Sequence, residues 1–522
     1  MSERPVDGVS PTVGAADDEV GAAAAAAGPG GAPVPVAMAQ MFGARIASTV
    51  LATLGVAVLG RLLTPSEFGV FGVGLAALGV ARALSEFGLG HFLVRRSELS
   101  DEEVRSAAGL AIALSSAIFV AAVVTVVVLG STGVVDLPGG TVGVTVFLGA
   151  SLVADAVAMP YQALRQRDVR FRLLAAIAVA QAGVDAAVAI GLALTGVGPA
   201  ALAAGLFASR LVSAVLLLGW SPAGARVRPS GSGWRRFRRF GGGFAIARLL
   251  PRVGELAVVS TISRGLGVGP VGLYNRAGTV YSIPDRTIFE AINPVIFPAL
   301  AKALRSSVTA ARVYLDKLDY LSVVCWPAFA SIAVLAEPLV GVMLGSQWDG
   351  AVAPVRILSV AGLFAPFTKM SMKLFVAMNR IDVHLRVQTA YVVATVVGAV
   401  IGGFVSLEAV CAALVVAQVV QTVGVWTGVS RAGSEQLAVP WPSIARSLLL
   451  TGVALVGPVG VVVWGGLPDL AALIVATGVG AVCWLAVMRW IDHPLLADAL
   501  AAVGRRPVAA SADATTSRPV GR

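Results

Sequence analysis

The stretch that decides the fold reads Arg61-Leu62-Leu63-Thr64-Pro65-Ser66-Glu67-Phe68-Gly69-Val70-Phe71. It lies between two apolar runs that are long enough to be membrane helices. Thr64 can cap the second helix, Pro65 suits its first position, and Glu67 stands three residues after the cap, which completes a capping box. We therefore predict a tight hairpin between two helices at this point in the chain.

Residues 264–274 repeat part of this pattern later in the chain. The pairs that fall in register are Arg61 with Arg264, Leu63 with Leu266, Gly69 with Gly272, and Phe71 with Tyr274. The prolines do not match, because they are two positions out of register. The partial repeat indicates a duplicated chain in which such a hairpin opens each copy.

The composition is that of an integral membrane protein. Hydrophobic residues make up 57% of the 522 positions and charged residues only 13%, whereas soluble proteins carry roughly 25% charged residues. The apolar runs lack the alternation of period two that a membrane barrel would show, so they predict helices. The net charge of +10 does not indicate a nucleic acid partner, because most basic residues lie in the loops of one side.

The apolar runs predict fourteen membrane-spanning helices and thus an all-α polytopic membrane protein. The expected spans are residues 38–60, 67–90, 106–130, 141–163, 173–195, 198–219, 241–263, 270–298, 318–337, 352–378, 387–404, 407–429, 447–465 and 469–490. The eighth span is too long for a simple crossing and contains Pro284, Pro294 and Pro298, so we expect it to kink.

Basic residues distinguish the two sets of loops that these spans define. Twenty-one Lys or Arg residues lie in the loops 91–105, 164–172, 220–240, 299–317, 379–386 and 430–446. The seven opposite loops hold two, Arg61 and Arg264. Because cytoplasmic loops are enriched in Lys and Arg, we expect both termini to be cytoplasmic and the protein to lie in the cytoplasmic membrane.

The order of the spans predicts two six-helix lobes and a C-terminal helix pair. The expected divisions are a disordered cytoplasmic tail (1–36), the first lobe (37–219), a basic cytoplasmic linker (220–240), the second lobe (241–429), the helix pair (430–491) and a cytoplasmic tail (492–522). An even number of helices in each lobe gives both the same orientation, so we expect a pseudo-twofold axis along the membrane normal.

Several patches resemble a known family. Besides residues 61–71, they are Leu84-Ser85-Glu86-Phe87-Gly88-Leu89-Gly90 with Leu93-Val94-Arg95-Arg96, residues 272–277, residues 292–300, and residues 337–358. Together these patches resemble the bacterial polysaccharide exporters, which are lipid-linked oligosaccharide flippases of the multidrug/oligosaccharidyl-lipid/polysaccharide superfamily. The resemblance implies a central cavity between the lobes, alternating access, and a lipid-diphosphate-linked glycan carried from the cytoplasmic to the outer leaflet.

Ionisable residues inside the expected spans are the candidates for function, because such residues are costly in hydrocarbon and usually face a cavity or a bundle interior. Apart from those at the ends of the spans, such as Glu67, Arg356 and Arg489, nine are basic and six are acidic: Arg45, Arg82, Glu86, Asp155, Asp185, Arg210, Arg248, Arg252, Glu255, Arg276, Asp285, Arg286, Glu290, Lys369 and Lys373. The excess of arginine suits an anionic substrate, because guanidinium groups pair bidentately with phosphate.

The seventh span carries the sharpest cluster. Arg248, Arg252 and Glu255 are spaced so that they share one helix face. Arg252 lies near the middle of the span, and we expect the preceding Pro251 to loosen the helix there. Two interpretations remain open: these residues line a cavity, or Arg252 and Glu255 only pair within the bundle.

The other candidates divide by charge. For the anionic group of a substrate we select Arg252, Arg248, Arg276, Arg286, Arg45 and Arg82; for counter-charges or a coupling proton or cation we select Glu255, Asp285, Glu290, Asp155 and Asp185. Arg82 and Glu86 could instead neutralise each other, and no partner for Arg210 is identified. The three histidines are scattered, so we expect no metal, and no catalytic residue or cofactor either.

These observations favour a flippase for a polyprenyl-diphosphate-linked oligosaccharide or a related anionic glycolipid, with membrane lipids and envelope polysaccharide assembly proteins as further partners. One alternative is a cation-coupled multidrug exporter of the same superfamily, which the arginine excess disfavours. The other is a polyprenyl-dependent glycosyltransferase or polymerase. Such an enzyme needs sizeable outer loops, whereas the longest outer connection, residues 338–351, has Asp349 as its only charge.

Overall fold

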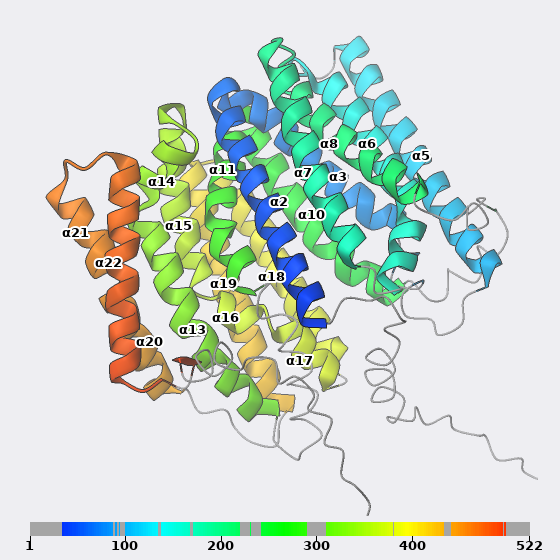
Figure 1. The fold of residues 1–522 in the computed structure, drawn as a ribbon. Coiled ribbons are helices and arrows are strands. Elements are labelled where there is room, and N and C mark those ends of the chain that lie inside the picture. The colour runs from blue at the N-terminus through cyan, green and yellow to red at the C-terminus, as the bar shows by residue number, and fades with distance from the viewer. Residues whose placement is uncertain are drawn as a thin grey trace, which may run out of the picture.

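The computed structural model describes residues 34–86, 89–90, 93, 100–133, 137–167, 171–219, 230, 242–289, 310–378, 380–432, 440–493 and 495–496. Within these ranges every element is a helix. The helices run roughly parallel to one another in a single bundle (Figure 1). The expected fold class, an all-α polytopic membrane protein, is confirmed.

The first six long helices are called the N-terminal group; they pack mainly on one another, except α3, which packs mainly on α10 and α11. They are α2 (Val34–Leu62), α3 (Pro65–Glu86), α5 (Asp101–Thr132), α6 (Thr141–Arg167), α7 (Phe171–Leu194) and α8 (Ala200–Gly219). In Figure 1 they run from blue to teal on one side of the bundle.

The following helices form the C-terminal group. They are α10 (Gly242–Gly265), α11 (Val268–Pro284), the π-helix η2 (Asp285–Phe289), α13 (Ala310–Val334), α14 (Ala336–Met343), the 3₁₀ helix η3 (Ser346–Ala351), α15 (Val352–Gly362), α16 (Ala365–Thr368), α17 (Ser371–Ala377), α18 (Ile381–Gly403) and α19 (Leu407–Ala432). A terminal set, α20 (Trp441–Ala454), α21 (Val456–Trp464) and α22 (Asp469–Trp490), packs on α13 and α14 at the far side (Figure 1).

The number of spans stays a prediction. In the described residues nine helices are long and apolar enough to cross a membrane, and α13 with α14 makes a tenth if this pair, bent by 74°, is one span. The remaining expected spans are occupied by helices that are charged, short or broken. The segment from Val352 to Ala377, for example, consists of the three short helices α15, α16 and α17.

Two local expectations met different outcomes. The eighth span changes from α-helix to π-helix directly after Pro284, whereas Pro294 and Pro298 lie outside the described residues. In contrast, α10 continues without a break through Pro251. The connection 338–351 is also not an extended loop, because α14 and η3 occupy most of it.

The predicted hairpin forms with its capping box. The Thr64 backbone N–H donates to Glu67 Oε2 at 2.7 Å, and the Glu67 N–H donates to Thr64 Oγ1 at 3.3 Å. Helix α3 then begins at Pro65. We call the end of the bundle where this hairpin lies the hairpin end.

The two helix groups meet closest at the crossing of α3 and α11, near the hairpin end. A Cβ on Gly69 would lie 1.8 Å from the carbonyl oxygen of Val268, and one on Gly272 would lie 1.9 Å from that of Pro65. The two contacts are reciprocal, since each glycine lies against the carbonyl one helical turn before the other glycine. Gly69 and Gly272 are also one of the repeated pairs in the sequence. Only glycine allows two helix backbones to approach so closely.

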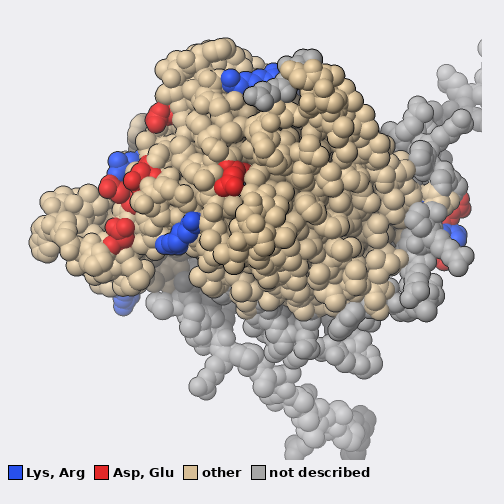
Figure 2. Space-filling view, turned by 90° about the horizontal axis from the view of Figure 1, so that it is seen from above, with Lys and Arg blue, Asp and Glu red and all other residues tan. Residues whose placement is uncertain are grey.

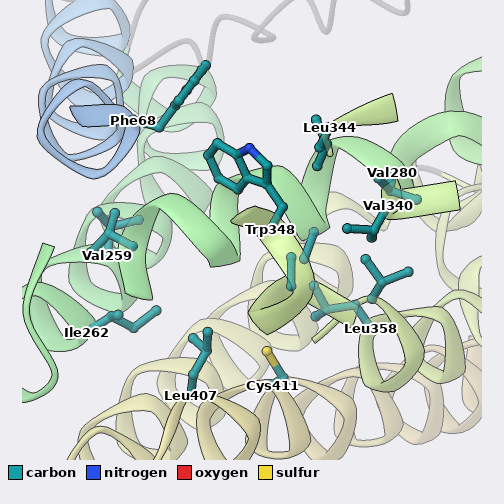
Figure 3. Close-up of a cluster of buried hydrophobic side chains, with 14 of the residues drawn as sticks. Phe68, Val259, Ile262, Val280, Val340, Leu344, Trp348, Leu358, Leu407 and Cys411 are labelled. Atoms are coloured by element: carbon teal, nitrogen blue, oxygen red, sulfur yellow. The ribbon is translucent and has the colours of Figure 1, made fainter. Parts of the chain in front are cut away.

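Aromatic and polar contacts also join the two helix groups at the hairpin end. Trp348 is fully buried and its Nε1 donates to the Gly60 carbonyl at 2.7 Å. Its ring meets that of Phe68 edge to face with centroids 5.2 Å apart, and Figure 3 shows it beside the buried Leu344. Arg61 Nη2 donates to the Val342 carbonyl at 3.0 Å. The first hairpin is therefore bonded directly to the C-terminal group.

Candidate functional site

An ion-pair cluster joins three helices of the N-terminal group. Arg82 of α3 is paired with Asp155 of α6, and Arg210 of α8 approaches the same carboxylate, with its Nε 3.7 Å from Asp155 Oδ1. Asp155 thus bridges two arginines. Its side chain is 24% exposed, so the bridge lies inside the helix group and in a low dielectric, where charges need partners.

Arg210 has a second acidic neighbour, which sequence reasoning did not identify. Asp185 of α7 packs against α8, where a Cβ on Gly205 would lie 2.8 Å from Asp185 Oδ1, and it interacts electrostatically with Arg210. Among the described residues, the Nε atoms of Arg82 and Arg210 are nevertheless buried without a hydrogen-bond partner. The carboxylates therefore do not use the full donor capacity of these arginines.

Arg252 of α10 lies where the two helix groups meet. Its Nη1 donates to Glu255 Oε2 at 2.8 Å within α10, as one interpretation of the sequence proposed. Its Cδ reaches α3, 3.4 Å from the position of a Cβ on Gly79, and it interacts electrostatically with Arg82. Because 54% of the Arg252 side chain remains exposed, the pair does not exclude a further ligand. We call Arg82, Arg210 and Arg252 the arginine cluster.

The arginine cluster lies far from the hairpin end. By the usual helical rise, Arg82 is about 25 Å from Pro65 along α3, Arg252 about 20 Å from Gly265 along α10, and Arg210 about 15 Å from Ala200 along α8. Figure 2 looks onto the hairpin end and shows a largely uncharged face with a few isolated charged residues. The cluster is therefore a feature of the bundle interior and not of this surface.

Two other predicted residues lie elsewhere. The Arg276 guanidinium stands over the Phe68 ring at 4.4 Å from its centroid, a cation–π contact near the hairpin end. Asp285, the first residue of η2, pairs with Lys369 at 2.9 Å. These residues do not join the arginine cluster.

Four predicted site residues fall outside what the structure describes. Arg45, Arg248 and Arg286 lie in α2, α10 and η2, but their side chains are not among those described, and Glu290 is outside the described residues. Glu86 interacts electrostatically with Arg82. Asp155 from another helix also makes an ion pair with this arginine.

One polar row in the C-terminal group was not selected from the sequence. Gln418 Nε2 donates to Thr368 Oγ1 at 3.0 Å and to Gln421 Oε1 at 3.2 Å, and Gln421 Nε2 donates to Gln388 Oε1 at 3.1 Å. The spacing of Gln418 and Gln421 in the middle of a largely apolar helix was the available signal, since residues three apart share a helix face. We call these four residues the amide row.

A family model described as polysaccharide biosynthesis protein matches residues 58–353, which is more than half of the chain. The chain belongs to the polysaccharide biosynthesis protein family. The hairpin, the glycine crossing and the arginine cluster all lie within the matched residues, whereas α18, α19 and the terminal helices lie beyond them. The family resemblance expected from the sequence patches is thereby confirmed.

Two curated relatives support this membership in the polysaccharide biosynthesis protein family. The lipopolysaccharide biosynthesis protein WzxC of Escherichia coli K12 is 24% identical over 375 residues, which cover 69% of this chain and 73% of that protein. The succinoglycan biosynthesis transport protein ExoT of Rhizobium meliloti 1021 is 28% identical over 316 residues. That match covers 60% of this chain and 63% of the relative's length.

A solved structure has the same fold. The lipid II flippase MurJ, in its inward closed conformation, superposes with a TM-score of 0.70 at 10% identity, covering 87% of this chain and 99% of MurJ. The superposition extends over both helix groups and into the C-terminal helices. This polysaccharide biosynthesis protein is therefore a multi-span membrane protein with the helix arrangement of that structure.

Proposed function

We propose that the protein is a flippase that carries a polyprenyl-diphosphate-linked oligosaccharide, or a related anionic glycolipid, from the cytoplasmic to the outer leaflet by alternating access. The observation that carries the proposal is the arginine cluster at the contact of the two helix groups. Membership in the polysaccharide biosynthesis protein family and the likeness to a relative named as a transport protein support it.

The chemistry of the arginine cluster suits a diphosphate. A guanidinium keeps its charge at physiological pH and offers paired N–H donors that match two phosphate oxygens. Arg252 is half exposed, and buried Nε donors of Arg82 and Arg210 lack partners among the described residues. In the proposal Arg248, Arg286, Arg276 and Arg45 supply further contacts along the path of the lipid. The acidic residues act as counter-charges or take up a coupling ion: Glu255, Asp285, Glu290, Asp155 and Asp185.

The orientation follows from the distribution of basic residues. We place the hairpin end at the outer side, because the loops of the other end hold nearly all loop Lys and Arg. Both termini are then cytoplasmic. The arginine cluster, about 15 to 25 Å from the hairpin end along its helices, would face a substrate that enters from the cytoplasmic side.

The lobes of the proposal are residues 37–219 and 241–429, joined by the linker 220–240. The close crossing of Gly69 and Gly272 holds the outer side shut. Release of the glycolipid outward requires this crossing to separate while the groups rock about the substrate. The protein moves its substrate without making or breaking a covalent bond, so we propose that it is not an enzyme.

A deletion strain tests the proposal. Lipid-linked glycan should accumulate in the cytoplasmic leaflet, where a membrane-impermeant lectin cannot label it on intact spheroplasts. Normal surface export and normal labelling in the deletion strain would contradict the proposed function.

Complementation with variants tests the arginine cluster. Arg252→Ala should lower export by about tenfold or more, because it removes a charge from the binding site. Arg386→Ala is the matched control, since Arg386 also pairs within its own helix, at 2.5 Å from Asp382, but is 76% exposed. Equal export by the two variants, at matched membrane levels, would show that Arg252 does not bind substrate.

A further inference from the structure

The amide row lies in the middle of the C-terminal group. On α19, Leu414 packs into the apolar cluster near the hairpin end, and Val425 into a second apolar cluster with Tyr314. Gln418 and Gln421 lie between these two residues on the same helix. A layer of uncharged polar groups therefore separates two apolar layers, and its members come from α16, α18 and α19, which are neighbours in the bundle (Figure 1).

Tyrosine hydroxyls extend this layer toward α10 and α11. Tyr391 follows Gln388 by three residues on α18 and so shares its face. It interacts electrostatically with Tyr274 and Tyr281 of α11, and Tyr274 in turn with Glu255. The Tyr391 side chain also interacts with that of Thr395 on its own helix, and the electrostatic interactions place these tyrosines between the amide row and Glu255.

Packing between α18 and α10 relates the amide row to the arginine cluster. Val392 of α18 packs on α10 at Gly254, where a Cβ would lie 3.2 Å from Val392 Cγ1. Gln388 is one helical turn from Val392, or about 6 Å of rise, and Gly254 is two residues from Arg252. Since Gly265 also meets Gly403, α10 and α18 run in the same direction, and Gln388 and Arg252 lie at similar heights on two packed helices.

The amide row has hydrogen-bonding capacity left. Each glutamine amide offers two donors and two acceptor lone pairs, and the row uses only part of them. In the described part of the chain, Gln388 uses its carbonyl oxygen as an acceptor but has no recorded partner for its Nε2. Gln388, Gln418 and Gln421 are half-buried and so are not closed off from a ligand.

We propose that the amide row and Tyr391 bind the hydroxyl groups of the glycan while the arginine cluster holds the diphosphate. The inference rests on the proposed flippase function and assigns the sugar part of the same substrate. Amides both donate and accept, as sugar hydroxyls do, and a tyrosine ring presents an apolar face with a polar tip. A charged diphosphate gains less from such neutral groups than from guanidinium groups.

The rival explanation is that the glutamines only join α18 to α19, since polar side chains do hold membrane helices together. The two explanations differ in what they predict for ligands. A sugar-binding row discriminates between lipids with and without a glycan, because a site built to bond a hydroxyl leaves polar groups unpaired when that hydroxyl is missing. A purely structural row affects both lipids alike.

The binding of lipid probes to the purified full-length protein in nanodiscs distinguishes the sugar-binding explanation from the structural one. The probes are undecaprenyl diphosphate alone and undecaprenyl diphosphate carrying glucose, galactose or N-acetylglucosamine. The wild type should bind at least one glycosylated probe more tightly than the bare lipid. Gln388→Leu and Tyr391→Phe should each lower the affinity for that probe by about tenfold, as expected for a lost hydrogen bond in a closed site, and change the affinity for the bare lipid by less than about twofold.

Thr422→Val is the matched control, because Thr422 is also polar and lies on α19, and its hydroxyl donates to the Gln418 carbonyl of its own helix rather than to a residue of the amide row on another helix, as far as the described residues go. It should leave all affinities unchanged. Tyr391→Phe removes one oxygen atom, so it decides the question even if Gln388→Leu does not fold.

Three results would overturn the inference. Equal binding of bare and glycosylated probes by the wild type would refute it while leaving the flippase proposal intact. Equal losses of affinity for the bare and the glycosylated lipid in the variants would refute it as well. The same holds if Gln388→Leu and Tyr391→Phe bind the glycosylated probe with wild-type affinity. Binding of none of the probes above a control phosphatidylglycerol nanodisc would instead refute the diphosphate site and the proposed function with it.

Discussion

The two helix groups solve the problem of polar residues in a membrane in different ways. In the N-terminal group Asp155 pairs with Arg82 and approaches Arg210, which also interacts with Asp185, so this interior contains charges of both signs. In the C-terminal group the amide row places neutral glutamines in a chain of hydrogen bonds. The groups are related by a weak sequence repeat, yet the repeat covers only their first hairpins.

The difference indicates a division of tasks. Guanidinium groups with unused donors bind phosphate bidentately, whereas amides can discriminate between ligands with and without a hydroxyl group. Arg252 is the link, because it belongs to α10 of the C-terminal group and reaches α3 of the N-terminal group. Substitutions in one group, or at the crossing of α3 and α11, therefore test whether the two groups differ in this way.

The largest effect is expected where the two groups meet. Gly272→Ala would put a methyl group 1.9 Å from the Pro65 carbonyl oxygen, so α3 and α11 must separate and export should fall by more than about tenfold, with a loss of thermal stability. Export by complemented cells and the melting temperature in detergent measure this.

Gly278→Ala on the same helix is the control for this crossing, since a Cβ there meets no atom within 4 Å. It should behave like the wild type. If Gly272→Ala does so too, the glycine crossing does not determine how the groups pack.

A smaller effect should distinguish the interiors of the two groups. Asp155→Leu leaves Arg82 and Arg210 without their shared carboxylate and should destabilise the protein by about 1 to 3 kcal/mol. Gln418→Leu should cost about 0.6 kcal/mol, the average for a polar contact between membrane helices. Chemical or thermal unfolding in one detergent compares them.

The double variant Asp155→Leu with Arg82→Met tests the origin of that cost. It should be more stable than the sum of the single variants predicts, because the arginine no longer lacks its partner. If the effects of the single variants simply add, the Arg82–Asp155 ion pair contributes nothing to the free energy of unfolding. The charged and neutral interiors would then not differ in what their polar contacts contribute to stability.

The smallest effect concerns the terminal helices. His493, just after α22, lies with its Nε2 3.4 Å from Asp319 Oδ2 of α13, and its Nδ1 accepts from the Leu495 N–H at 3.2 Å. Burial lowers the pKa of His493; Arg446 lowers it further, and the carboxylate of Asp319 opposes both.

The folded protein thus favours the neutral form of His493. The contribution of His493 to the free energy of unfolding is therefore complete above the ordinary histidine pKa of about 6.5 and is lost as the pH falls below that value. The melting temperature should drop slightly more between pH 8 and pH 5.5 in the wild type than in His493→Gln. The same drop in both proteins would contradict a role for His493 in docking the terminal helices.

Local features of the fold could be predicted because their causes lie within a few residues. The capping box of Thr64 and Glu67 formed as expected, since both partners belong to one helix turn. The shared face of Arg252 and Glu255 followed from their spacing, and the small residues Gly69 and Gly272 were placed in register by the repeat.

The partners of the arginines could not be predicted in the same way. Arg82 was compared with Glu86, its neighbour on the helix, but its ion pair is with Asp155 on α6. The glutamines of the amide row were not selected, because the spacing of Gln418 and Gln421 indicates only a shared face of one helix, whereas the row forms where α16, α18 and α19 meet.

The order of residues alone indicates a helical membrane protein with a hairpin at residues 61–71, a partial repeat and more basic than acidic groups in its spans. Hydropathy, caps and residue spacing act along one segment, so they can be recognised without the fold. The folded chain adds that Asp155 bridges two arginines, that Arg252 reaches α3, and that Gly69 meets α11 beside Gly272. These contacts join helices far apart in the chain, and the packing of whole helix faces selects them.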